Sequence, residues 1–181
     1  MKSRITHYLG HQTLLIAQII FLLFFVQLFL IDVGRVDGTS MESTMVDQEF
    51  FFVDRLSLLF RQPHRYEVIQ FFHPLRENHV VVKRIIGLPG ETINIRSDKI
   101  VITQADGQEL TLEEPYLSDS VRTLIKPGWN ARFVIPTDSY FLLGDNRNFS
   151  VDSREFGPVH RKYITGIVNT LHMPFSDVKK R

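Results

Sequence analysis

One apolar run near the amino terminus constrains this chain more than any other feature. From Thr13 to Ile31 the sequence carries no charge, and its only polar side chains are one threonine and two glutamines. About 20 helical residues cover the ~30 Å hydrocarbon core of a bilayer, whereas a cleavable leader has an apolar region of about 7–15 residues before a small-residue cleavage site. No Ala-x-Ala pattern follows in 30–34. Because a soluble core helix is seldom apolar on every face, we expect one transmembrane helix over 13–31.

Charges on the two sides of the run predict its orientation. Lys2 and Arg4 precede it, whereas Asp32, Arg35 and Asp37 follow it. Basic residues are retained on the cytoplasmic side, so the amino terminus should be inside. The predicted organisation is a cytoplasmic tail over 1–12, a membrane anchor over 13–31 and an extracytoplasmic β-rich domain over 32–181, in a single-pass protein of the cell membrane.

The part after the anchor has the pattern of β-structure. Short β-branched and aromatic runs alternate with turn signals such as Asp106-Gly107, and no stretch keeps a helical period over three turns. The fold class expected is therefore mostly β, an antiparallel β-sheet domain with one amino-terminal transmembrane helix. The predicted strands are Glu49–Asp54, Glu67–Phe72, His79–Ile86, Thr92–Ile95, Lys99–Thr103, Glu109–Leu112, Arg132–Ile135, Tyr140–Leu143 and Thr165–Thr170.

Composition excludes several functional classes. A chain of 181 residues has room for one domain and a short appended element. Its 21 basic and 20 acidic residues leave a formal charge of +1, which argues against nucleic acid as a partner. The absence of cysteine excludes disulfides, thiolate metal sites and a thiol nucleophile. We expect no metal and no cofactor.

Ser40 and Lys83 are the candidate catalytic pair. A serine hydroxyl attacks an amide only when a base removes its proton, and none of the seven histidines lies in a recognisable triad context. Lys83 lies in a β-branched run in which Val81 and Ile85 would share its face. Burial there would lower its pKa from about 10.4 and supply a neutral amine. Periodicity alone leaves open a lysine that snorkels from an edge strand.

Three blocks of the sequence resemble, in order, the signature boxes of bacterial type I signal peptidases. They are 38–41 (Gly-Thr-Ser-Met), 83–91 and 144–157, and the shorter segment Glu114-Pro115-Tyr116-Leu117 is similar to the Gram-positive branch of that family. The resemblance covers nearly the whole chain. It implies a signal-peptidase-like β domain and a serine endopeptidase that cleaves the signal peptides of exported precursor proteins with a Ser-Lys dyad.

The resemblance also implies a role for individual residues at the site. Ser40 would be the nucleophile, Lys83 the general base and Ser150 the hydroxyl that orients the lysine amine. The N–H of Ser40 would hold the oxyanion; Gly38 stands where the Gram-negative branch has a serine that supplies a second donor, so a main-chain group or water must replace that donor. The structural residues implied are Met41 after the nucleophile and an ion pair of Arg84 with Asp152, supported by Asp145 and Arg154.

Two departures from the family pattern leave an alternative open. Ser43 replaces the usual proline after the nucleophile, and Tyr66-Glu67 replaces Gly-Asp at the start of a hydrophobic strand. The alternative is a noncatalytic signal-peptidase-like factor of pilus assembly, with pilus subunits or assembly proteins as partners besides the membrane. A self-cleaving Ser-Lys repressor would instead require a DNA-binding segment where this chain has its apolar run.

Overall fold

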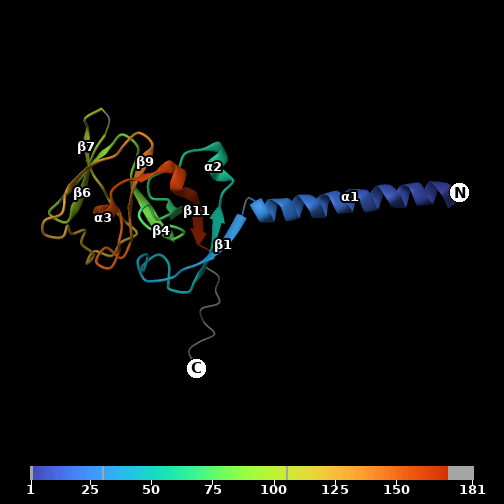
Figure 1. The fold of residues 1–181 in the computed structure, drawn as a ribbon, viewed down its shortest axis with the longest axis horizontal. Coiled ribbons are helices and arrows are strands. Elements are labelled where there is room, and N and C mark those ends of the chain that lie inside the picture. Colours follow the sequence, from blue (N-terminus) through green and yellow to red (C-terminus); the bar gives the residue numbers. More distant parts are fainter. Residues whose placement is uncertain (1, 30, 105, 171–181) are drawn as a thin grey trace, which may run out of the picture.

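Two antiparallel sheets carry the body of the protein, and α1 (Lys2–Phe29) extends away from them (Figure 1). The computed structural model describes residues 2–29, 31–104 and 106–170, and for 2–10, 26–29, 31 and 170 it describes the backbone alone. The larger sheet has the order β1-β2-β11-β3-β4-β9-β10 and the smaller one β7-β6-β5-β8. The strands are β1 (Ile31–Arg35), β2 (Phe50–Asp54), β3 (Val68–Phe72), β4 (Val80–Gly87), β5 (Thr92–Arg96), β6 (Lys99–Thr103), β7 (Glu109–Thr111), β8 (Arg132–Val134), β9 (Ser139–Leu143), β10 (Val159–His160) and β11 (Ile164–Thr170). The remaining short elements are α2 (Ser57–Phe60), α3 (Ser153–Phe156) and the 3-10 turn η1 (Arg161–Tyr163).

The prediction of a mostly β antiparallel domain is confirmed. Each of the nine predicted strands corresponds to an observed one, with ends that differ by no more than one residue. Two strands were not predicted. The two-residue β10 is too short to leave a pattern, and β1 begins within the apolar run that was assigned to the anchor.

The prediction for the anchor needs correction. Residues 13–29 are helical, but Ile31 belongs to β1, which pairs with β2 from Ile31 to Arg35. Within the described residues no helix is long and apolar enough to cross a membrane. The predicted span over 13–31 runs past 25, the last residue of α1 whose side chain is described.

Three buried clusters form the core and position the site. The first joins the two sheets, since Ile86 and Phe141 of the larger sheet pack with Ile93 and Ile102 of the smaller one. The second packs on the opposite face of β4 and β9, where it includes Ile85, Tyr140 and Leu142. The third holds the segment between β1 and β2 against the larger sheet, and its buried residues are Val36, Met41, Met45, Phe51, Val53, Val68 and Val168. The sequence around Ser40 is thus fixed to the core on the side of β1, β2 and β11.

Candidate active site

The nucleophile turn, residues 39–45, is a series of tight main-chain turns. The N–H of Glu42 donates to the carbonyl of Thr39, and the N–H groups of Thr44 and Met45 both donate to the carbonyl of Met41. Met41 and Met45 are 2% and 0% exposed, so their packing in the core holds the turn in place. Met41 therefore lies in the core directly after Ser40.

Ser40 and Lys83, the predicted catalytic pair, lie in contact. Lys83 Nζ lies 2.6 Å from Ser40 Oγ and 3.0 Å from the carbonyl oxygen of Val82. The lysine is 3% exposed, so it does not snorkel to solvent. Burial lowers its pKa from 10.5 to about 8, against the opposing effect of the Asp152 and Asp145 carboxylates. A neutral amine in contact with a serine hydroxyl can act as the base of a nucleophilic hydrolysis.

The predicted ion pair between Arg84 and Asp152 is wrong in its partner. Arg84 pairs with Asp145, through Nε to Oδ1 at 2.9 Å and Nη2 to Oδ2 at 2.6 Å. Asp152 pairs instead with Arg154, which contacts it through Nε at 2.9 Å and Nη2 at 2.8 Å. All four side chains are buried. Asp152 also caps α3 and accepts from the N–H of Gly144. Its hydrogen-bond partners therefore lie within the 144–157 block.

Ser150 does not contact Lys83 in the way the resemblance implies. Its Oγ is buried and has no hydrogen-bond partner within the described residues. It packs instead on Gly144, where a Cβ would come within 2.2 Å of that oxygen and 2.5 Å of the Ser40 carbonyl oxygen. Gly144 therefore allows the 144–150 loop to approach the nucleophile turn closely, and Ser150 is adjacent to the dyad without orienting it.

The N–H of Gly38 has a hydrogen-bond partner, Asp47, that the sequence did not indicate. Gly38 has a φ of +97°, which favours glycine, and its N–H donates to Asp47 Oδ1 at 2.9 Å. That hydrogen bond lowers the pKa of the Asp47 carboxyl. The N–H of Ser40 has no acceptor within the described residues, so it is available to an oxyanion, whereas the N–H of Gly38 is engaged.

A cavity of about 270 Å³ opens beside the dyad. Its walls come from the end of β1 and the following segment, from the nucleophile turn and from the first half of β4. Phe51 forms part of its lining and packs so closely on Gly34 that a Cβ there would lie 2.3 Å from the ring. The cavity thus has a mixed polar and apolar lining that includes Ser40 and Lys83.

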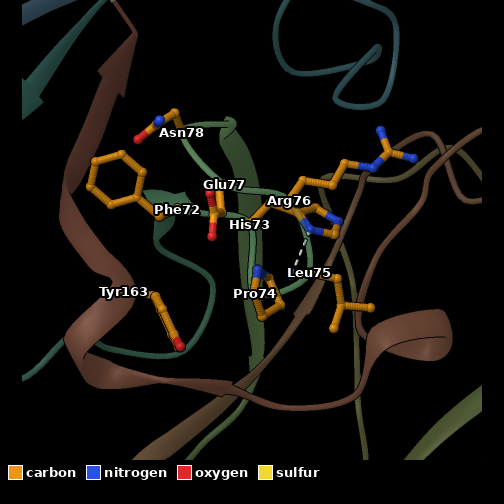
Figure 2. A pocket seen from close by; sticks show the side chains of 8 residues that line it. All are labelled: Phe72, His73, Pro74, Leu75, Arg76, Glu77, Asn78 and Tyr163. Atoms are coloured by element: carbon orange, nitrogen blue, oxygen red, sulfur yellow. Dashed lines mark hydrogen bonds between the residues drawn. The ribbon is translucent and has the colours of Figure 1, made fainter.

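A larger cavity lies elsewhere and lacks this chemistry. It measures about 580 Å³ and is formed by residues 72–78 of the β3–β4 connection together with Tyr163 (Figure 2). Its buried His73 accepts a hydrogen bond from the N–H of Leu75 at Nδ1, 3.1 Å away. Burial lowers the pKa of His73. The two cavities share no lining residue, and the dyad belongs to the smaller one.

Asn146 and Thr44 are site residues that sequence reasoning missed. The N–H of Asn146 donates to the carbonyl of Ser40, and its Nδ2 donates to the carbonyl of Thr39, each over 3.1 Å. Thr44 is hydrogen bonded to Arg84 and Asp145. Both residues lie within or next to the blocks that carry the family resemblance, which is the only sequence signal that could have pointed to them.

Ser43 adopts a backbone conformation that proline cannot reach. Its φ is 102°, in the region that L-residues rarely occupy, whereas proline is fixed near −65°. The serine that departs from the family pattern is therefore matched to the local shape of the nucleophile turn.

We expect Ser43→Pro to destabilise the protein by more than about 1 kcal/mol and to lower kcat at least about tenfold, because the turn must change shape. Ser43→Gly is the matched control, since glycine accepts a positive φ without strain and should keep stability and activity. Thermal unfolding and cleavage of a precursor peptide measure both effects. A proline variant as stable and active as the parent would contradict the assigned conformation.

Comparison with known proteins connects this geometry to a family. The profile of the family described as "Signal peptidase, peptidase S26" matches residues 9–173. The chain is similar to signal peptidase I V of Bacillus subtilis (strain 168), with 33% identity over 144 residues that cover 75% of this chain and 82% of that protein. It is similar to signal peptidase I P of Bacillus subtilis subsp. natto, with 35% identity over 158 residues, 84% of this chain and 82% of that protein. A crystal structure of a signal peptidase I from Enterococcus faecalis V583 matches at 32% identity and a TM-score of 0.48, covering 60% of this chain and 98% of that chain.

Proposed function

The chain belongs to the signal peptidase family S26 as a signal peptidase I, a serine endopeptidase that removes signal peptides, and from that premise we propose that Ser40 and Lys83 carry out the cleavage. The observation that carries this assignment is the 2.6 Å separation of Lys83 Nζ and Ser40 Oγ, within a site where the lysine is buried. A noncatalytic assembly factor would have no need for such a pair.

The reaction proceeds through an acyl-enzyme. Neutral Lys83 accepts the proton of Ser40 as the hydroxyl oxygen attacks the scissile carbonyl carbon, and the N–H of Ser40 stabilises the oxyanion. The lysine ammonium then protonates the leaving amine, which departs as the mature protein. Water attacks the ester with Lys83 again as base, and the signal peptide leaves with a free carboxylate while Ser40 recovers its proton.

The substrate binds as an added strand beside β4. Val80–Val82 of β4 pair with β3, but the pairing of β4 with β9 begins only at Arg84. An extended precursor segment can therefore pair with this first half of β4, opposite the 34–38 segment that forms the other wall of the cavity. Met41, Met45 and Phe51 limit the depth of the cavity, which favours small side chains near the cut.

We assign the protein to a cell membrane, with α1 holding it there. Large apolar side chains of α1 from Leu14 to Phe24 are 52–69% exposed. Lipid is the environment that such a surface requires. The amino terminus would then be cytoplasmic and the sheets extracytoplasmic, where exported precursors present their signal peptides. Pilus subunits are one class of precursor that the same site could process.

Replacing Ser40 by alanine tests this function. In a membrane fraction that contains the full chain, Ser40→Ala should lower precursor cleavage by a factor of about 10³ or more, because the nucleophile is lost. Ser57→Ala is the control, since it removes a serine hydroxyl of α2 that is hydrogen bonded to Asp54 of β2, away from the dyad. The readout is the ratio of mature to precursor protein for a panel of general and pilus-type precursors. Unchanged processing by Ser40→Ala would favour the assembly-factor alternative.

A further inference from the structure

We propose that Thr44 is a positioning residue for the cleavage reaction, whose hydroxyl clamps the nucleophile turn between Arg84 and Asp145 and so fixes Ser40 against Lys83. The inference rests on the proposed roles of Ser40 and Lys83. Thr44 itself touches neither catalytic side chain in the described contacts, so it acts through the turn that carries the nucleophile.

The Thr44 hydroxyl uses both of its hydrogen-bonding capacities. It accepts from Arg84 Nη2 at 2.9 Å and donates to Asp145 Oδ2 through a short hydrogen bond. Its partners are the two members of a buried ion pair. Because the hydroxyl accepts from one ion and donates to the other, the two hydrogen bonds together fix its orientation.

Arg84, one of the two partners of Thr44, makes further contacts that hold it in place. The guanidinium of Arg84 donates through Nη1 to the carbonyl of Tyr66 at 2.8 Å, and it stacks over the ring of Tyr116, 4.1 Å from the centroid. Tyr116 in turn donates to Glu114. The ion pair is thus a rigid reference point rather than a mobile surface contact, and a group bonded to it is fixed with it.

The chain positions of these partners turn the contacts into a clamp. Arg84 directly follows the base Lys83, and Asp145 directly precedes Asn146. The N–H of Asn146 holds the carbonyl of Ser40 at 3.1 Å, while Asp145 holds the hydroxyl of Thr44. Two adjacent residues of the 144–150 loop are therefore hydrogen bonded to both ends of the nucleophile turn: Asn146 to Ser40, and Asp145 to Thr44. Loss of the Thr44 contact opens one end of that clamp.

The backbone of Ser43 supplies an independent reason for the clamp. Its φ of 102° is a strained conformation for an L-residue, and such conformations persist only where the surroundings fix them. Thr44 is the next residue, and its side chain is bonded to the fixed ion pair. Without those bonds the turn can relax, and a shift of about 1 Å at a reacting group costs about 10²-fold in rate.

Thr44→Val tests the inference because valine keeps the shape of threonine and removes the hydroxyl. We expect kcat on a precursor peptide to fall about 10- to 100-fold with KM changed less than about twofold, since the substrate cavity does not contain Thr44. Thr44→Ser retains the hydroxyl and should recover kcat to within about threefold. If Thr44→Val does not fold, Thr44→Ala replaces it with the same expected loss.

Thr123→Val is the matched control. Thr123 is a buried threonine whose hydroxyl accepts from Arg147, a member of the buried ion pair with Glu114, and it lies outside the nucleophile turn. Both valine variants lose one hydroxyl beside a buried ion pair, so their melting temperatures should fall similarly. Only Thr44→Val should lose kcat. Equal kcat losses at equal stability, or a Thr44→Ser variant as slow as Thr44→Val, would overturn the positioning role.

Hydrogen exchange separates this inference from the proposed function. If the full-length wild-type chain cleaves no precursor, or Ser40→Ala cleaves as well as wild type, the proposed function fails. The clamp is then judged by the amide exchange of residues 39–45, which should be faster in Thr44→Val than in wild type and in Thr123→Val. Unchanged exchange in Thr44→Val would reject the clamp whatever the activity.

Discussion

Lys83→Met is expected to abolish cleavage while making the folded protein more stable at neutral pH. The methionine side chain is apolar and of similar length, so it fills the same buried space. The base is lost, however, and general base catalysis contributes about 10²–10⁴-fold. Lys83 is also the group that returns a proton to the leaving amine, so we expect the upper end of that range. Cleavage of a precursor by full-length wild type and variant measures the loss.

The gain in stability follows from the depressed pKa of Lys83. Its pKa is about 8 in the folded protein against an ordinary 10.5. Below pH 8 the amine is charged in both states, so burial costs the folded state about 3 kcal/mol, at about 1.4 kcal/mol per pH unit of difference. That cost disappears as pH rises from 8 to 10.5, because the folded state releases its proton first. Lys83→Met should therefore raise the free energy of unfolding at pH 7 by up to about this amount, and by much less at pH 10.

The pH profile of the wild type supplies the control for this prediction. Below pH 8, kcat/KM should fall about tenfold per unit as Lys83 becomes protonated in the free enzyme. Lys162→Met, at an exposed lysine of η1, should keep that acid limb unchanged. A wild-type profile that is flat from pH 6 to 9, or appreciable cleavage by Lys83→Met, would contradict the assignment of the base.

The strands and the dyad could be predicted because their causes are local. A strand such as β6 (Lys99–Thr103) is a β-branched run that ends near an Asp-Gly turn, and Gly107 has the positive φ of 86° that such turns need. Lys83 lies among valine and isoleucine residues, a run that still allowed the lysine to snorkel from an edge strand, and the family resemblance favoured the buried base. Local sequence, together with the order of three family blocks, was enough to place Ser40 opposite Lys83.

The rest of the site depends on choices that local sequence does not make. Arg84 could pair with either of two aspartates in the 144–157 block, and only the path of that loop decides that Asp145 reaches it. Ile31 was assigned to the anchor and β1 was not predicted, because the pairing of β1 with β2 is a tertiary contact. The unusual φ of Ser43 and the double hydrogen bond of Thr44 are likewise visible only once the turn is folded against its neighbours.

Asp145→Ala is expected to cost about 3–5 kcal/mol in the free energy of unfolding. The change leaves the guanidinium of Arg84 buried without its counter-charge, which is far more damaging than loss of an exposed pair. The control is Asp32→Ala, which breaks a pair with Arg55 in which both side chains are more than 40% exposed. That loss should be about 0–1 kcal/mol. Chemical denaturation at neutral pH measures both.

A double-mutant cycle then identifies the partner of Arg84, which was the error of the sequence-based prediction. Once Arg84→Met has removed the guanidinium, Asp145→Ala should cost several kcal/mol less than it does in wild type, because the two charges form one pair. The same cycle with Asp152→Ala should show little coupling, since Asp152 is paired with Arg154 and caps α3. Strong coupling of Arg84 to Asp152 and none to Asp145 would restore the pairing implied by the family resemblance. It would also remove the rigid reference that holds Thr44, because both of its hydrogen-bond partners belong to this ion pair.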